Sequence, residues 1–331
     1  MAYSPVNAFN VSGSNVLGQL VDNYLIRRAL DALRPVFVFA QIAQNEDIPA
    51  AEGKTVTWFR RTNMPAASTT GVQEGIVGTS LATPPTKTVS ATVSQYADFI
   101  NLSDIMLKVA PDPQMAANAD ELGFRAGLTL DNVARGVIDA GTGAAGTALS
   151  TYLTARDFEA QAHILAGSNV LPMDSGWFEA YTHPYTAFDV LNDPSAGSLP
   201  DLEKYTSDVT GEKQDRDVLG TFGGVRIRKS TQVTKTAGTP NQWRTYIFGK
   251  GAFGGTRLSG MGYSQVYDPN KQQFKVFSKT FDTPDVANPT GQIGGIVSYN
   301  FTAAFALLEG PSGIGGTYRN SYIDTPSSIV A

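Results

Sequence analysis

The sequence has 331 residues, of which 42% are apolar and 17% are charged, and its formal net charge is −5 at pH 7. This acidic balance argues against a basic clamp for nucleic acid, and the absence of cysteine excludes disulfides and thiolate metal sites. No apolar run reaches the roughly 18 residues that a membrane-spanning helix needs, and the low charge suggests a surface that other protein covers.

The first 50 residues are expected to form an arm that contains one helix. Residues 1–10 lack the basic and apolar regions of a signal peptide, so the cytosol is the expected compartment. Residues 14–34 place apolar side chains at helical spacing, with Ser14 as the N-cap and Pro35 beyond the end.

A strand, a long connection and a second strand follow. Residues 54–62 are rich in β-branched and aromatic side chains, and residues 86–94 alternate strictly, with Val89, Ala91 and Val93 on one face. The connection is long and rich in Gly, Pro and Thr, which is uncommon unless the connection has a function. Because both arms have a polar face, the hairpin must project from its domain or lie on a neighbouring molecule.

The strongest helical pattern covers residues 113–140. Asp112 can cap this helix, Pro113 fits the first helical position, and Gly141 follows the end. At about 1.5 Å per residue the helix would be roughly 40 Å long, and the rest of a domain could pack along it. Its apolar stripe predicts a buried core made of Leu122, Leu130, Val133 and Val137.

Shorter elements follow this helix and long strands return near the end of the chain. The pattern predicts helices at 155–165 and 184–191 and strands at 176–182, 274–281 and 293–307.

The stretch GTGAAG (141–146) fits G-x-G-x-x-G, the dinucleotide-binding pattern. That pattern works only after a strand and before the N-terminus of a helix, where the backbone dipoles favour an anion. Here a long helix comes first and points its carbonyl end at Gly141, so we interpret these glycines as a helix stop and a hinge.

Candidate catalytic residues are sparse. His163 and His183 are the only histidines, which argues against a catalytic triad and against a histidine-rich metal site, and structural roles are favoured for both. The acidic stretch 201–217 could hold a carboxylate pair or Ca²⁺, but it lacks the calcium-loop spacing, and a solvated loop is favoured. We therefore expect no catalytic residue, no cofactor and no metal ion.

Arg60 and Arg61 lie on the first arm of the hairpin, and adjacent strand residues point to opposite faces. One arginine can therefore meet its own sheet while the other meets a neighbouring subunit. Arg60, Arg61 and Glu74, in the connection, are our candidates for inter-subunit contacts.

This order of elements resembles the major capsid protein of tailed double-stranded DNA bacteriophages. Particular stretches resemble one branch, the coat proteins typified by coliphage N-four. These stretches are GKTVTWFRR (53–61), VQEG (72–75), VSQYADFINLSDIM (93–106), DELGFRAGLTLDNVARGVIDAGT (120–142) and EAYTHPYTAFDVLND (179–193).

The resemblance implies an α+β fold with an N-arm, an extended E-loop hairpin, a peripheral domain with a long spine helix, and an axial domain. The implied division is an N-arm at 1–50, the E-loop at 51–95, the peripheral domain at 96–146, the axial domain at 147–254, and a return to peripheral strands with a C-terminal tail at 255–331.

The function implied by the resemblance is self-assembly, as hexamers and pentamers, into the icosahedral virion shell. That shell would enclose double-stranded DNA without sequence-specific binding. It would assemble in the host bacterial cytoplasm with scaffolding, portal and decoration proteins as partners and without a membrane.

Two other functions stay open. A tail-tube or other virion structural subunit would share the long hairpin, but it would usually be smaller and built around a β-barrel. A carbohydrate-active hydrolase would use the acidic stretch, although carboxylates on a polar loop are poorly positioned for catalysis.

Overall fold

The computed structural model describes residues 10–11, 14–15, 24–29, 31–32, 38–49, 52–61, 75, 86–109, 113–140, 146–193, 218–236, 241–258, 274–280, 289–308 and 319–329. The helices are α2 (Phe39–Ile42), α3 (Asp104–Val109), α4 (Gln114–Ala140), α5 (Ala155–Gly167) and α6 (Pro184–Leu191), and residues 24–29 and 31–32 are also helical. The strands are β1 (Asn10–Val11), β2 (Ser14–Asn15), β3 (Gln44–Ile48), β4 (Thr55–Arg61), β5 (Thr86–Thr92), β6 (Ser94–Ser103), β7 (Gly146–Ala148), β8 (Phe178–Thr182), β9 (Val218–Phe222), β10 (Val225–Lys229), β11 (Lys235–Thr236), β12 (Gln242–Phe248), β13 (Phe253–Leu258), β14 (Phe274–Thr280), β15 (Ile293–Leu307) and β16 (Asn320–Pro326).

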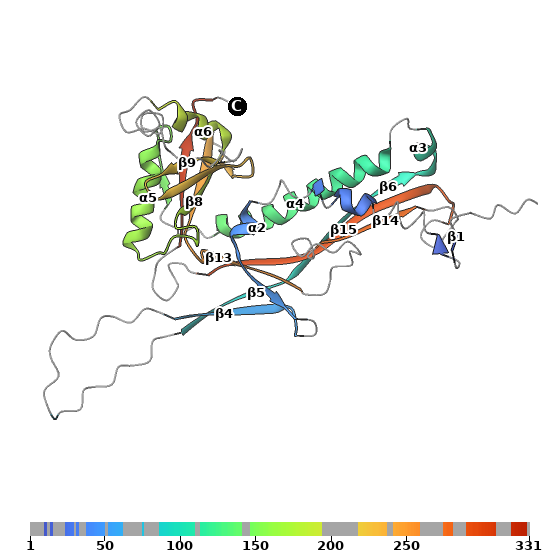
Figure 1. Cartoon of the computed structure of the whole chain (residues 1–331), viewed down its shortest axis with the longest axis horizontal. Coiled ribbons are helices and arrows are strands. Elements are labelled where there is room, and N and C mark those ends of the chain that lie inside the picture. Colours follow the sequence, from blue (N-terminus) through green and yellow to red (C-terminus); the bar gives the residue numbers. More distant parts are fainter. Residues whose placement is uncertain are drawn as a thin grey trace, which may run out of the picture.

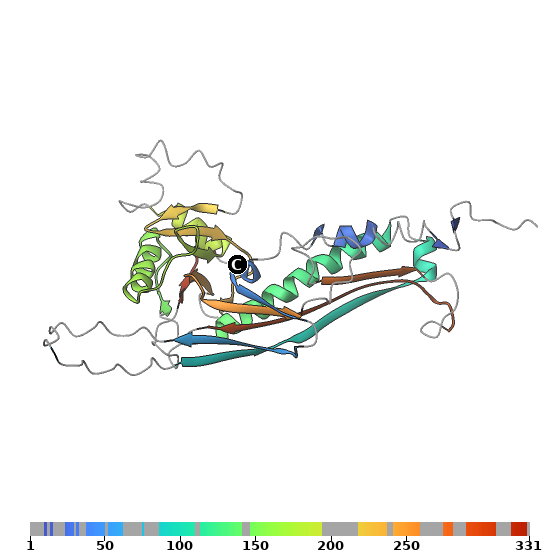
Figure 2. The same cartoon turned by 60° about the horizontal axis from the view of Figure 1, so that its bottom comes forward.

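The molecule is elongated, with a rounded body at one end (Figure 1). In the long part, which we call the peripheral domain, α4 lies along β6, β15 and β14, and α3 lies at the far end (Figure 2). In the rounded part, which we call the axial domain, α5 and α6 flank a seven-stranded sheet with the order β7-β16-β12-β8-β10-β9 and β11 beside β12.

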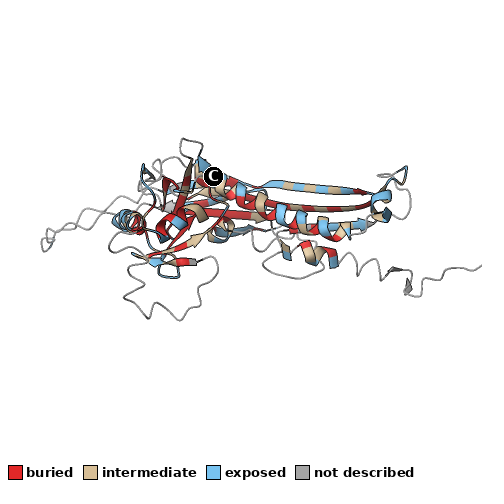
Figure 3. Cartoon of the chain, turned by 90° about the horizontal axis from the view of Figure 1, so that it is seen from above, coloured by how far each residue is buried: buried red, intermediate tan, exposed pale blue. Residues whose placement is uncertain are grey.

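The helix α4 has 27 residues and buries one stripe against the long strands. Figure 3 shows the buried residues of α4 and of the strands facing one another along the peripheral domain. Leu122 and Leu130 are each 2% exposed, and Leu130 belongs to the cluster that contains Tyr299 and Phe301 of β15. The helical residues 24–29 pack against α4 as well, and their Leu25 and Ala29 are buried in the same core.

The last turns of α4 differ from the expected stripe. Val133 and Val137 are only half-buried, whereas Ala134 and Ile138 are buried. The reason is a second core: Ala134 and Ile138 pack with Phe39 of α2 and with aromatic residues of the axial domain. The helix α4 therefore packs in one core as far as Leu130 and in a second core after it, and its buried residues after Leu130 are spaced four apart.

The expected hairpin is formed by β4 and β5, which pair antiparallel with Trp58 opposite Val89. Trp58 is 4% exposed and packs with Ala91 and Val93 in a small core of its own. A Cβ atom at Gly254 of β13 would lie 2.8 Å from the Trp58 ring, so only glycine lets the indole lie on this strand. The base of the hairpin is therefore anchored within the subunit, and its connection, residues 62–85 apart from Gly75, lies outside the described residues.

The axial domain forms from strong local signals. Thr154 and Asp157 make a capping box at the start of α5, and His183 caps α6, whose first residue is Pro184. The strand β8 lies inside the sheet, between β12 and β10, and all five of its residues are buried. Such a continuously buried strand needs cover on both faces, which the flanking helices help to supply.

One expectation from the sequence needs correction, and two elements were not expected. Ser14 does not cap a helix, because Ser14–Asn15 form β2, which pairs with β1. The short helix α3 was not expected. The C-terminal tail, for which the sequence predicted no element, contains β16, which pairs with β12 and β7 in the axial sheet. Strand pairing joins residues far apart in sequence, and the period of one segment does not reveal its partner.

Candidate functional site

The expected contact residues occupy the outer end of the hairpin strands. Arg60 and Arg61 are the last residues of β4, opposite Lys87 and Thr86 of β5. As consecutive strand residues, the two arginines belong to opposite faces. Their side chains, and Glu74, lie outside the described residues, so their contacts stay a prediction.

The two histidines lie in ordinary structural environments. His163 is exposed on α5, with Nε2 3.7 Å from a Glu159 carboxylate oxygen. His183 accepts a hydrogen bond from the backbone N–H of Tyr185 and stacks on Trp243, with 3.7 Å between ring centroids. Burial, and to a smaller extent the charge of Lys235, lowers the pKa of His183 to about 4, so its imidazole is neutral at pH 7.

The described residues contain no group of three His, Cys, Asp or Glu side chains that could hold a metal ion. Within the same residues, no helix has the length and hydropathy of a membrane span. Of GTGAAG, only Gly146 is described, as the first residue of β7, and the acidic stretch 201–217 lies outside the described residues.

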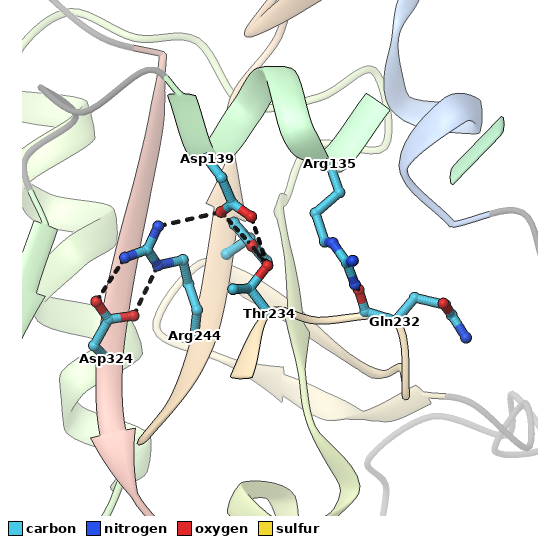
Figure 4. A network of polar contacts seen from close by, with 7 residues as sticks. Arg135, Asp139, Gln232, Thr234, Arg244 and Asp324 are labelled. Carbon is cyan, nitrogen blue, oxygen red and sulfur yellow. Dashed lines mark hydrogen bonds and ion pairs between the residues drawn. The ribbon is translucent and has the colours of Figure 1, made fainter. Parts of the chain in front are cut away.

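A polar network joins the end of α4 to the axial sheet (Figure 4). Asp139 on α4 accepts hydrogen bonds from the Tyr246 hydroxyl at 2.6 Å and from Nη1 of Arg244 at 3.2 Å, both on β12. Arg244 also donates to both carboxylate oxygens of Asp324 on β16, at 2.8 and 2.9 Å. The network therefore ties the long helix to two strands of the axial domain.

The electrostatics of this network favour its charged form. The hydrogen bonds from Arg244 to Asp324 raise the pKa of the guanidinium, so Arg244 stays positive. Burial, followed by the charge of Asp139, raises the pKa of the Tyr246 hydroxyl, which therefore stays protonated and donates. Each group has a partner of opposite charge or a matching donor, and such an arrangement is rigid rather than reactive.

Several of the most exposed apolar side chains lie on α3, on the hairpin and on β6. Ile105 and Val109, one turn apart on α3 at the far end of the peripheral domain, are each 74% exposed. Phe59 on the hairpin is 71% exposed, and Phe99 on β6 is 62% exposed. Exposed apolar side chains on a terminal helix, a hairpin strand and a sheet face suit contact with other protein chains.

Sequence reasoning missed α3, although a signal was present. Ile105 and Val109 are four residues apart, as are Asp104 and Lys108, whose charged atoms lie 2.7 Å apart. These spacings are helical, but a helix of six residues gives too short a pattern to stand out.

No protein-family model matches the sequence, and no curated protein matches it. Solved structures match most of the chain. The capsid of Ralstonia phage GP4 aligns with a TM-score of 0.62 at 13% identity and covers 88% of this chain and 88% of that chain. The capsid asymmetric unit of cyanophage Pam1 aligns with a TM-score of 0.62 at 12% identity, over 90% of this chain and 92% of that chain.

The capsid structure of cyanophage P-SCSP1u aligns with a TM-score of 0.57 at 12% identity and covers 88% of each chain. The likeness covers nearly the whole length of both partners in each comparison. The α+β fold described above is therefore the fold seen in these phage capsid structures.

Proposed function

We propose that this chain is a major capsid protein that self-assembles, as hexamers and pentamers, into the icosahedral shell around a phage double-stranded DNA genome. The observation that carries the proposal is the fold itself, which aligns with phage capsid subunits over nearly its full length. The exposed apolar residues on α3, β6 and the hairpin support it, because a subunit that tiles a shell needs surfaces for contact with its neighbours.

The absence of an assembled catalytic set among the described residues is consistent with this role. His183 is a buried helix cap, His163 is exposed on α5, and the polar network at the domain junction is fully paired. The net charge of −5 also suits a shell that encloses DNA, because many basic contacts to phosphate would hold the genome tightly.

Finer parts of the proposal rest on the sequence stretches. Those at 53–61, 93–106, 120–142 and 179–193 favour the N-four-type branch. By analogy with that branch, scaffolding, portal and decoration proteins are the proposed partners, and the host cytoplasm is the proposed place of assembly.

The fold weighs against the alternatives. A tail-tube subunit is built around a β-barrel, whereas here a helix of 27 residues supports an open sheet. A hydrolase would need carboxylates positioned for catalysis, and the two carboxylates of the junction network, Asp139 and Asp324, are held in ion pairs with Arg244.

Sedimentation and electron microscopy of the purified protein test the proposal. We expect closed shells of megadalton mass. Open rings or tubes would instead support a tail-tube subunit, and a monomer that stays stable at high concentration would contradict a shell protein.

A further inference from the structure

The helix α2 begins without a capping side chain of its own. Val38, the residue before it, offers no hydrogen-bond acceptor in its side chain, and no local cap is made. Instead, Asp131 of α4 supplies the acceptor from 92 residues away. Its Oδ1 accepts from the backbone N–H groups of Phe39 at 2.8 Å, Val38 at 3.1 Å and Ala40 at 3.4 Å.

Asp131 is only 1% exposed, and the described residues offer its Oδ2 no hydrogen-bond partner. Burial raises the pKa of Asp131 to about 6, opposed by the three N–H groups and by the charge of Arg135. The other titratable group that faces it is Tyr181 of β8, and α2 itself contributes none. Burying a carboxylate with an unsatisfied oxygen lowers the stability of the fold. We therefore expect the role of Asp131 to be the positioning of the backbone that it binds.

The residues that Asp131 holds lie at the junction of the two domains. Phe39 is fully buried, and its ring centroid lies 5.2 Å from that of Tyr246 and 6.0 Å from that of Tyr181. The hydrogen bonds fix the backbone on the spine helix, and the ring fixes the same residue against the axial sheet.

The hairpin leaves the subunit a few residues further on. After α2 the chain enters β3, which runs parallel to β13 with Ile48 opposite Leu258. The next strand is β4, the first arm of the hairpin, and its Trp58 lies on the same β13. Residues 38–48 are thus the root of the hairpin, held by Asp131 at the beginning and by strand pairing at the end.

We propose that Asp131 is the positioning residue that fixes the hairpin root on the spine helix and so sets the direction in which the hairpin reaches a neighbouring copy. The part of this proposal that concerns the neighbouring copy rests on the proposed function; the part that concerns the root does not.

The clamp formed by Asp131 on residues 38–40 also depends on pH. An aspartate released to solvent has the ordinary pKa of 3.8, below the value of about 6 in the clamp, so the closed clamp is favoured by acid and weakens as pH rises through about 6.

Amide hydrogen exchange on unassembled full-length subunits tests the clamp. Asp131→Ala should lower the protection of Phe39, Ala40 and β3 by about tenfold or more, because it removes the side-chain acceptor of three backbone N–H groups. Asp131→Asn keeps an acceptor oxygen in the same place and should restore most of this protection. The matched control is Asp120→Ala on the same helix, which removes a surface ion pair with Arg28 and should leave the root unchanged.

The pH dependence of amide protection at residues 39–48 separates a positioning role of Asp131 from a general effect on the stability of the subunit. In the unmodified protein the protection factors at residues 39–48 should fall as pH rises from about 4 to about 6, and in Asp131→Asn they should stay level. Unchanged protection at the root of a folded Asp131→Ala variant would overturn the proposal. So would an Asp131→Asn variant with the same pH slope as the unmodified protein, a result that can be read even if Asp131→Ala does not fold.

Electron microscopy of the same variants tests the link to assembly. Asp131→Asn should give shells, and folded Asp131→Ala subunits should give fewer or malformed shells. Normal shells from Asp131→Ala subunits whose root has lost protection would contradict the link to hairpin direction. If the unmodified protein forms no shells at all, the proposed function fails, while the exchange data still decide whether the clamp exists.

Discussion

Replacing Gly123 with alanine should destabilise the subunit, whereas the same change at Gly136 on the same helix should stabilise it. A Cβ atom at position 123 would lie 2.0 Å from the carbonyl oxygen of Ala29 and 2.8 Å from its carbonyl carbon. These are backbone atoms of the helical residues 24–29, so the clash is relieved only if that segment moves away from α4. At Gly136 an added Cβ meets nothing within 4 Å.

The magnitude follows from two opposing effects. Alanine is favoured over glycine inside a helix by about 1 kcal/mol, and this gain applies equally at both positions. Overpacking a tight contact costs about 1–3 kcal/mol and applies only at position 123. We therefore expect Gly136→Ala to raise the unfolding free energy of the subunit by about 1 kcal/mol. The unfolding free energy of Gly123→Ala should lie about 1–3 kcal/mol below that of Gly136→Ala.

Urea unfolding of the unassembled subunits measures both values, and amide exchange at residues 24–29 shows whether the Gly123→Ala change acts where the structure places it. Equal stabilisation by the two substitutions would refute the reasoning, because it would mean that no backbone crosses α4 at Gly123.

Three further predictions concern the core, the hairpin and pH. Leu130→Ala should cost about 2–5 kcal/mol of unfolding free energy, measured by urea unfolding, because Leu130 is 2% exposed among aromatic neighbours; a cost below 1 kcal/mol would contradict that placement. Reversing Arg60 and Arg61 together to Glu should give folded subunits that fail to assemble, as judged by sedimentation, and normal shells would count against an inter-subunit ion pair. The pKa of His183 in the folded protein, about 4, lies below its ordinary value of 6.5. As pH drops, the imidazole is therefore protonated in the unfolded chain before it is protonated in the folded one. The unfolding free energy should fall between about pH 6.5 and pH 4. His183→Gln should flatten that part of the stability profile, and an unchanged profile would mean that the imidazole is not buried.

The sequence predicted well those elements whose signals are local. The stripe of α4 as far as Leu130, the alternation of β5 and the His183–Pro184 start of α6 each depend on residues within a few positions of one another. Such signals do not need the rest of the fold to be known.

The features that escaped prediction depend on residues far apart in the chain. The helix α2 has no capping residue of its own, and its cap is Asp131, 92 residues from Phe39. The choice of Ala134 and Ile138 over Val133 and Val137 as buried residues depends on the second core, which the axial domain completes. The junction network around Arg244 likewise joins α4, β12 and β16, and nothing in their local patterns indicates that they meet.

The central claim is that the hairpin of a shell-forming subunit clasps a neighbouring copy. The most direct test is limited proteolysis of the connection around residues 71–78, compared between free subunits and assembled particles separated from one preparation by sedimentation. We expect rapid cleavage there in free subunits, because three of the eight residues at 71–78 are glycine and the segment offers little to bury alone, and strong suppression in the particles. Equal cleavage rates in the two states would contradict the claim that the hairpin lies on a neighbour.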